Sequence, residues 1–139
     1  MIHQEEINVG PFPRGFHIIT NEINRVLNNE FQVKTGFVQI FIKHTSASIT
    51  INENADPSVR VDMKSWFDDN IKENLPYYTH TIEGPDDMPA HIKSALLDTS
   101  LTIPISDGQL NLGTWQGVYL CEHRNKADKR KLVITVFGE

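Results

Sequence analysis

The densest group of side chains able to do chemistry lies in the stretch HTIEGPDDMPAHIKSALL, which runs from His80 to Leu97. Imidazole nitrogens and carboxylate oxygens are common ligands of divalent metals, and carboxylates also act as general bases. The stretch is therefore the first candidate for a functional site. Its ionisable side chains of interest are those of His80, Glu83, Asp86, Asp87 and His91.

The same stretch predicts a loop followed by a short helix. Gly84 and Pro85 favour a turn, because glycine tolerates positive φ and proline fixes φ. Asp86 and Asp87 then lie where a helix over residues 89–97 would begin, so we expect one of them to cap that helix and the other to face the site. An alternative stays open, in which the aspartates only cap a surface helix and the histidines are solvated.

A second set of polar residues lies where predicted strands end. His44 opens a polar turn that contains Ser46 and Ser48, and rigid scaffolds often present functional groups at such positions. The same hydroxyls could instead cap the backbone of the turn. Asn52 and its two polar neighbours follow at the exit of the next strand, where they exceed what one helix cap requires.

His123 and Arg124 form a third candidate, at the end of a late strand. A guanidinium can bind a phosphate or a carboxylate through two parallel hydrogen bonds. Residues 126–131 are rich in lysine and arginine, which is typical of a solvated tip. We therefore expect Arg124, rather than that basic tip, to bind an anionic group of a substrate.

Hydrophobic periodicity predicts two further helices. One is expected over residues 20–29, with Thr20 or Asn21 as its cap. The other, of about fifteen residues, follows the cap Asp56 and has Trp66 or Phe67 in its buried stripe, with the tryptophan expected in the core.

The same periodicity predicts the strands. A strand at residues 36–43 is expected to be central and covered on both faces, because it is nearly all apolar. The last two strands are expected to pair as a hairpin, and residues 107–108 to form a two-residue turn. The expected strands cover residues 2–9 (an edge strand), 36–43, 47–53, 101–105, 109–112, 118–122 and 131–137.

Composition limits the class of protein. The 139 residues suffice for one domain, 1–139, but not for a (β/α)₈ barrel, which needs about 250 residues. A net charge of −5 argues against nucleic-acid binding, and no apolar run is long enough to span a membrane. Since the single cysteine, Cys121, cannot form an internal disulfide and no signal region is recognisable, we expect a cytoplasmic protein.

Common catalytic signatures do not occur in the sequence. It contains no P-loop, no GxGxxG, no GxSxG, no HExxH and no CxxC motif. Four longer motifs do occur in order: RGFH at 14–17, HTSASITINENADPSVRVDM at 44–63, HTIEGPDDMPAHIKSALL at 80–97 and GTWQGVYLCEHR at 113–124. Together they resemble the YjbQ family, also called the secondary thiamine-phosphate synthase family.

The resemblance implies an α+β fold, a YjbQ-like mixed β-sandwich with two to three short helices in a single domain, assembled as a homotrimer. It also implies a metal-binding histidine cluster, with His44, His80 and His91 as ligands and His123 as an alternate. Imidazole ligands favour zinc, whereas the nearby carboxylates also suit magnesium, so both divalent ions stay open.

The family name implies an enzyme that joins a pyrimidine diphosphate to a thiazole phosphate, giving thiamine phosphate. Two alternatives stay open: a metal-dependent hydrolase or lyase of another phosphorylated metabolite, and a non-catalytic trimeric ligand-binding protein. For an enzyme, the expected catalytic residues are Glu83, Asp86, Asp87 and Asn52. The residues expected to bind a phosphorylated small molecule are Arg124, Ser46, Ser48 and His123.

Overall fold

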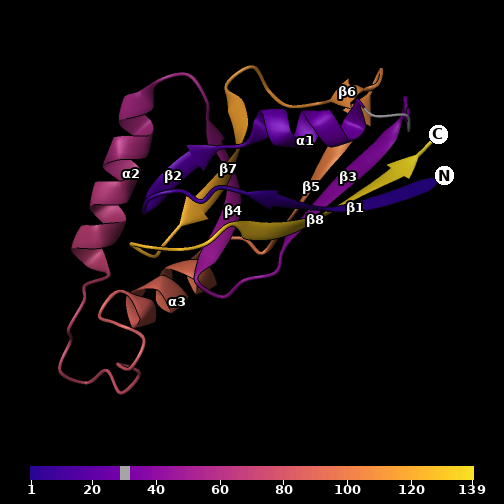
Figure 1. The fold of residues 1–139 in the computed structure, drawn as a ribbon. Helices are drawn as coiled ribbons and strands as arrows, with labels where there is room; N and C mark the ends of the chain where they lie inside the picture. Colours follow the sequence, from indigo (N-terminus) through magenta and orange to yellow (C-terminus); the bar gives the residue numbers. More distant parts are fainter. Residues whose placement is uncertain (29–31) are drawn as a thin grey trace.

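The computed structural model describes residues 1–28 and 32–139 (Figure 1). The helices of this part of the chain are α1 (Thr20–Leu27), α2 (Pro57–Asn70) and α3 (Asp87–Leu96). Its strands are β1 (Ile2–Val9), β2 (Gly15–Ile18), β3 (Gly36–Ile42), β4 (Ala47–Glu53), β5 (Ser100–Ser106), β6 (Gln109–Leu110), β7 (Gln116–Glu122) and β8 (Arg130–Gly138).

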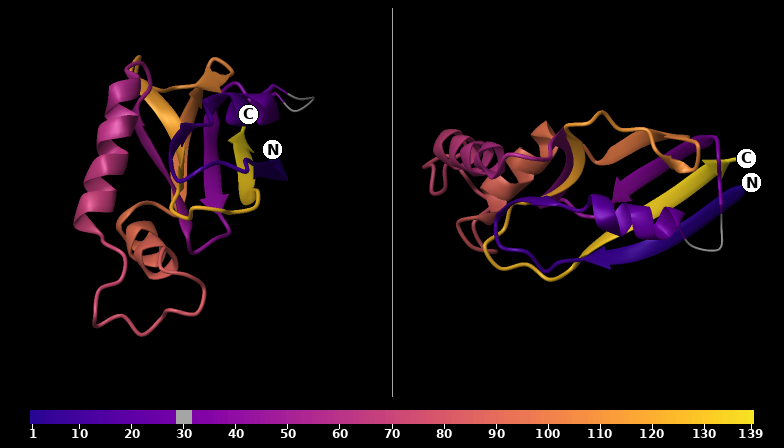
Figure 2. Two further views of the ribbon diagram at one scale, coloured as in Figure 1. Left: turned by 60° about the vertical axis from the view of Figure 1, so that its left-hand side comes forward. Right: turned by 90° about the horizontal axis from the view of Figure 1, so that it is seen from above.

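The strands form two sheets. The larger has the order β1-β8-β3-β5-β6, and the smaller has the order β2-β7-β4. Every strand pairing among the described residues is antiparallel, so the predicted α+β class is confirmed but the sheets are not mixed. Figure 2 shows α2 standing against the smaller sheet, on the side away from the larger one.

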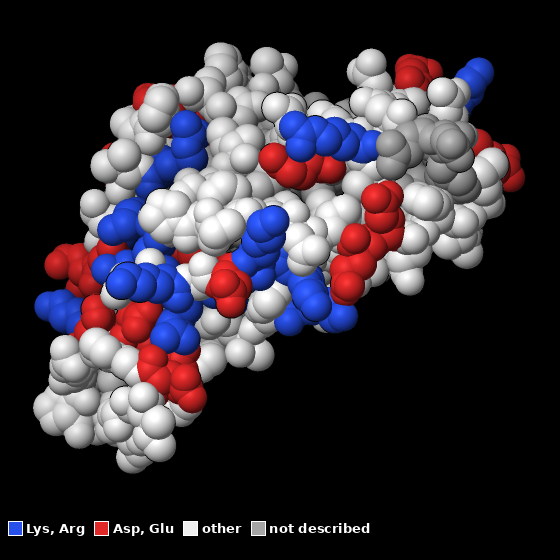
Figure 3. Space-filling model, in the orientation of Figure 1, with Lys and Arg blue, Asp and Glu red and all other residues white. Residues whose placement is uncertain are grey.

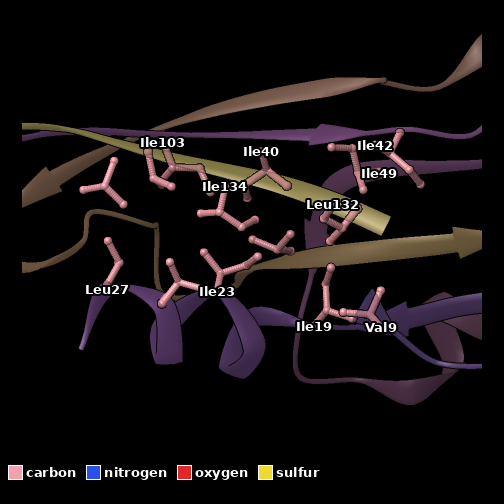
Figure 4. Packing of buried hydrophobic residues seen from close by; sticks show 14 of the residues in the cluster. Val9, Ile19, Ile23, Leu27, Ile40, Ile42, Ile49, Ile103, Leu132 and Ile134 are labelled. Carbon is pink, nitrogen blue, oxygen red and sulfur yellow. The ribbon is translucent and has the colours of Figure 1, made fainter. Parts of the chain in front are cut away.

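The main hydrophobic core lies between the larger sheet, the smaller sheet and α1 (Figure 4). Alternate residues of β3, namely Val38, Ile40 and Ile42, point into it, as the two-residue period of a strand requires. Helix α1 contributes Ile23 and Leu27, which lie one turn apart on one face. The apolar periodicity of the sequence therefore predicts the residues of this core well.

Helix α2 packs on the outer face of the smaller sheet, where Met63 and Phe67 contact a second apolar cluster. Its predicted cap is confirmed, because Asp56 Oδ1 accepts the N–H of Ser58 at 2.9 Å. The prediction for Trp66 is wrong: this side chain is 57 % exposed, and the neighbouring Phe67 takes the position that faces the sheet.

The predicted cap of α1 is also wrong. Ile19 occupies the N-cap position, and Thr20 Oγ1 instead accepts the N–H of Val118 at 3.0 Å. The helix is described as far as Leu27, and its predicted end at Asn29 lies outside the described residues. Among the helices of residues 1–28 and 32–139, none has the length and apolar character needed to cross a membrane.

The last two long strands do not form the predicted hairpin. β7 pairs with β2 and β4, whereas β8 pairs with β1 and β3 in the other sheet. The long connection, residues 123–129, instead carries the chain from the smaller sheet to the larger one. A buried ion pair joins the ends of this crossing, because Arg130 Nε donates to Glu122 Oε1 at 2.8 Å.

Strand β3 is central, as predicted, but its outer face is not covered in the part of the chain that the structure describes. Phe37 and Phe41 are 40 % and 45 % exposed there, opposite Phe137 and Val133 of β8. The edge position of β1 is confirmed, and so is the turn at 107–108, where both residues have the positive φ of a type I′ hairpin.

Candidate metal centre

The candidate site lies where loop 71–86 meets α3. Asp87 is the first residue of α3 and His91 stands one turn later, so both side chains lie on one face of the helix. His80 reaches them from the loop: its Nε2 lies 2.7 Å from Asp87 Oδ2, and His91 Nε2 lies 3.1 Å from the same oxygen. One ligand atom of each residue lies within 4.8 Å of the other two. We call His80, Asp87 and His91 the His–Asp cluster.

The donor atoms of the His–Asp cluster fit a divalent metal ion. The carbonyl oxygen of Thr45 accepts a hydrogen bond from His91 Nδ1 at 2.9 Å, which fixes the tautomer and turns Nε2 toward Asp87. Either a second proton or a cation must then lie between Nε2 and the carboxylate. A zinc ion, with ligand bonds of about 2.0–2.2 Å, meets that requirement.

Asp87 is held as a carboxylate. Its side chain is only 5 % exposed, and such burial raises the pKa of an acid. The hydrogen bond from His80 and the positive charges of His91 and Arg124 outweigh burial, so the pKa of Asp87 is lowered. His80 is 46 % exposed, and the cluster therefore opens to solvent on the side of the loop.

Arg124, just past the end of β7, holds both aspartates. Its Nε donates to Asp86 Oδ2 at 2.9 Å, and its Nη1 donates to Asp87 Oδ1 at 2.6 Å. Its Nη2 donates to the carbonyl oxygen of Glu83 at 2.8 Å, so all three nitrogens have protein partners. The role of Arg124 in binding an anionic substrate stays a prediction.

The prediction that one aspartate caps α3 through its side chain is wrong. Asp86 occupies the N-cap position, but its carboxylate makes no hydrogen bond to the helix. Asp86 Oδ2 instead accepts from Arg124 and from the N–H of Asn125 at 2.9 Å, because the crossing 123–129 passes beside the start of α3.

Of the predicted ligand set, the structure brings together His80 and His91 but not His44. The Nε2 of His44 accepts the N–H of Lys131 at 2.8 Å, and its Nδ1 lies 3.4 Å from Arg130 Nη1. Both ring nitrogens face the start of β8, because the backbone next to His44 still pairs with that strand. Asp87, expected as a catalytic carboxylate, is instead the third residue of the His–Asp cluster.

The other predicted residues are held by partners outside the His–Asp cluster. Ser46 Oγ accepts from Arg130 Nη2 at 3.2 Å. Ser48 Oγ lies 2.8 Å from His123 Nε2 in the interior, and Asn52 Oδ1 accepts the N–H of the next residue near the end of β4. The expected catalytic or substrate-binding roles of these residues stay predictions.

His123 belongs to the protein interior, where it is 3 % exposed. Burial, assisted by the positive charges of Lys93 and Arg130, lowers the pKa of His123 to about 3. The imidazole is therefore neutral at physiological pH. Burial likewise raises the pKa of the Cys121 thiol to about 12, so this cysteine is protonated and is a poor nucleophile.

Sequence reasoning missed Asp87 as a candidate ligand although a signal was present. Residues 87–91 read DMPAH, and a spacing of four places two side chains on one helix face. The contacts of Arg124 with Asp86 and of His91 with Thr45 join residues that are 38 and 46 positions apart. Local patterns contain no signal for such contacts.

Comparison with known proteins gives consistent matches. A family model described as UPF0047 protein YjbQ-like matches residues 5–139. The chain is 48 % identical to the UPF0047 protein YjbQ of Salmonella typhimurium and 43 % identical to that of Escherichia coli O157:H7, in each case over the whole of both chains. A solved structure of a YjbQ/UPF0047 family protein from Clostridium acetobutylicum has a TM-score of 0.81 at 34 % identity, covering 97 % of this chain and 99 % of that chain.

We predict that His123 makes the folded protein sensitive to mild acid. Its folded-state pKa of about 3 lies below the unfolded value of about 6.5, so below pH 6.5 the unfolded state takes up a proton that the folded state excludes. Its contribution to stability is complete above that pH and is lost progressively as the pH falls toward 3. Urea unfolding should show a loss of about 1.4 kcal/mol per pH unit from this residue.

Comparison of His123→Gln with the wild type isolates this contribution. The variant should flatten the fall in unfolding free energy between about pH 7 and pH 5. An equally steep fall in His123→Gln would contradict the prediction.

Proposed function

The chain belongs to the UPF0047 YjbQ-like family, and we propose that it is an enzyme that uses a divalent cation bound by the His–Asp cluster. The observation behind this proposal is the approach of two imidazole nitrogens to one buried carboxylate oxygen, at 2.7 and 3.1 Å. Three protein ligands leave a coordination position open, as catalytic sites do, whereas structural zinc sites have four protein ligands. This difference favours an enzyme over a non-catalytic ligand-binding protein.

Zinc is the ion that suits this donor set best. Two imidazoles and one carboxylate are a common zinc ligand set, while magnesium prefers oxygen ligands and retained waters. Asp86 Oδ2 is engaged by Arg124 and Asn125, and among the described residues Asp87 is the carboxylate that groups with the two histidines. We therefore propose zinc. Magnesium is the alternative, and a calorimetric titration with magnesium would detect its binding.

A small phosphorylated substrate fits the charge of the site. A bound divalent cation would supply a Lewis acid there. Arg124 holds the carboxylate of Asp87 in one orientation and adds a positive charge beside it, with its side chain 23 % exposed. On the left of Figure 3, lysine and arginine side chains gather among aspartates and glutamates. With a divalent cation bound, the added positive charge of the cluster would suit an anionic substrate.

The reaction itself stays a prediction. Thiamine-phosphate synthesis is implied by the resemblance alone, and a hydrolase or lyase acting on another phosphorylated metabolite is the alternative. Both reactions develop negative charge on a phosphate or diphosphate, which a cation and a neighbouring arginine would stabilise. The cytoplasm stays the predicted location, because the single cysteine is a buried free thiol.

We predict that zinc affinity depends on the His–Asp cluster and not on His44. His80→Ala, His91→Ala and Asp87→Asn should each weaken zinc binding by more than about 100-fold, since loss of a ligand should exceed the 10–100-fold effect of an outer residue. His44→Ala should bind zinc as the wild type does, because its ring nitrogens face β8. Isothermal titration calorimetry of untagged protein measures these affinities.

Two results of that titration would change the assignment. A loss in His44→Ala equal to the loss in His80→Ala would restore the ligand set of His44, His80 and His91. Unchanged affinity in all three cluster variants would remove the metal site, and with it the proposed enzyme.

We predict that Arg124 acts by positioning Asp87. Arg124→Lys keeps the charge but loses the planar group that contacts two aspartates and a carbonyl at once. Zinc affinity should fall by about 10-fold, in the range for residues that orient a metal ligand. Lys126→Ala, an exposed change in the same crossing 123–129, is the matched control and should have no effect.

A different outcome would point to the substrate instead. If Arg124→Lys binds zinc normally but the zinc-loaded variant loses affinity for inorganic phosphate, then Arg124 binds the anionic group of the substrate, as its position at a strand end first indicated.

We also propose a homotrimer that forms through the outer face of the larger sheet. Phe37 lies opposite Phe137, with ring centroids 5.3 Å apart, and Phe41 lies on the same exposed face. Large exposed apolar groups that gather on one sheet face are typical of an interface. The exposed side chains of Phe37, Phe41 and Phe137 therefore support association between copies of this chain.

Light scattering should give a mass about three times the 15.8 kDa of one chain. The double variant Phe37→Ser with Phe137→Ser should lower that mass, because it removes apolar contact area. Trp115→Ser serves as the control, since this residue is 65 % exposed but lies outside the larger sheet. A monomeric wild type, or an unchanged mass in the double variant, would contradict the proposal.

A further inference from the structure

A pocket of about 370 Å³ lies directly beside the His–Asp cluster. It is formed by loop 71–86 together with the first turn of α3, and His80 belongs to both the pocket and the cluster. Met88 lines it from the helix, immediately after Asp87. The pocket and the candidate ligands are therefore parts of one continuous surface.

The walls of the pocket are mostly apolar and carry no acidic or basic group other than His80. Leu75, Tyr78, Pro85 and Met88 supply flat or polarizable surfaces. Thioether sulfur and aromatic rings make favourable contacts with another ring. Pockets of this size and composition are typical of small-molecule sites.

The walls are also held in place. Tyr78 is fixed at both ends, because its N–H donates to the carbonyl of Leu75 at 3.0 Å and its hydroxyl donates to the carbonyl of Lys72 at 3.1 Å. The far end of the loop is fixed by the contact of Arg124 with the carbonyl of Glu83.

We propose that this pocket binds an uncharged aromatic or heteroaromatic ring of the substrate while the polar end of the same molecule lies at the His–Asp cluster. This inference rests on the proposed function, since the cluster must hold a cation for the polar end to bind. The contrast between uncharged walls and a charged neighbour sets the orientation of the substrate. In Figure 3 the lower left end of the molecule, where Figure 1 places loop 71–86, is mostly without charged side chains.

The test compares two metal-binding probes that differ only in the ring. Acetohydroxamate and benzohydroxamate carry the same metal-binding group. Benzohydroxamate has a phenyl ring where acetohydroxamate has a methyl group. Calorimetry with zinc-loaded protein should give at least roughly tenfold tighter binding of benzohydroxamate, because the ring removes apolar surface from water.

Matched variants locate the effect. Leu75→Glu places a charge in the pocket and should abolish the preference for benzohydroxamate while keeping the affinity for acetohydroxamate. Ile82→Glu introduces the same charge in the same loop at a residue that is 94 % exposed, and should keep the preference. Met88→Gln keeps the length of the side chain and should weaken the preference without disturbing the loop.

The outcomes separate the two proposals. If zinc and acetohydroxamate bind but the ring adds nothing, or if Leu75→Glu and Met88→Gln keep the preference, the pocket does not bind a ring and the metal site stands. If zinc does not bind, both proposals are overturned. Acetohydroxamate binding in each variant shows that the cluster is intact and that the variant is folded.

Discussion

The guanidinium of Arg124 is the interaction on which the candidate site depends. Two consecutive carboxylates, Asp86 and Asp87, lie nearly buried at the start of α3, and like charges so close together would destabilise each other. Arg124 donates to one oxygen of each, and its third nitrogen holds the loop that carries His80. The other oxygen of Asp87 is thereby left to the two histidines.

Further ion pairs join separate elements near the candidate site. Glu122 and Arg130 form a buried pair where the chain crosses between the sheets, and Lys93 of α3 reaches Asp68 of α2 at 2.7 Å. A buried charge is costly unless it is paired, so each pair fixes the relative position of two elements. The opposite part of the molecule is different, because there the two sheets and α1 are held by an aliphatic core. Stability and site geometry therefore come from different kinds of interaction.

The features that the sequence predicts correctly have local causes. Asp56 before Pro57 caps α2, the Asp-Gly turn at 107–108 joins two strands, and the period of two in β3 selects its buried residues. The failures involve partners far away in the chain. Periodicity identifies β8 as a strand, but only tertiary packing decides that it pairs with β1 and β3 rather than with β7. The contacts of His44 have the same kind of cause, since its two ring nitrogens lie beside residues of β8 that are more than 80 positions away in the chain.

Two residues of the His–Asp cluster lie on a helix and the third lies on a loop, and these two kinds of element tolerate sequence change differently. Asp87 and His91 are spaced by a helical turn, so α3 places both side chains on one face, and Arg124 and the carbonyl of Thr45 then orient them. His80 and all of the pocket-lining residues except Met88 come from one loop between α2 and α3. Insertions and substitutions are tolerated best in loops, whereas a change of register in a helix moves every side chain. If the site binds a substrate as proposed, substitutions in loop 71–86 would change which molecule the pocket admits, while Asp87 and His91 would keep their spacing on α3.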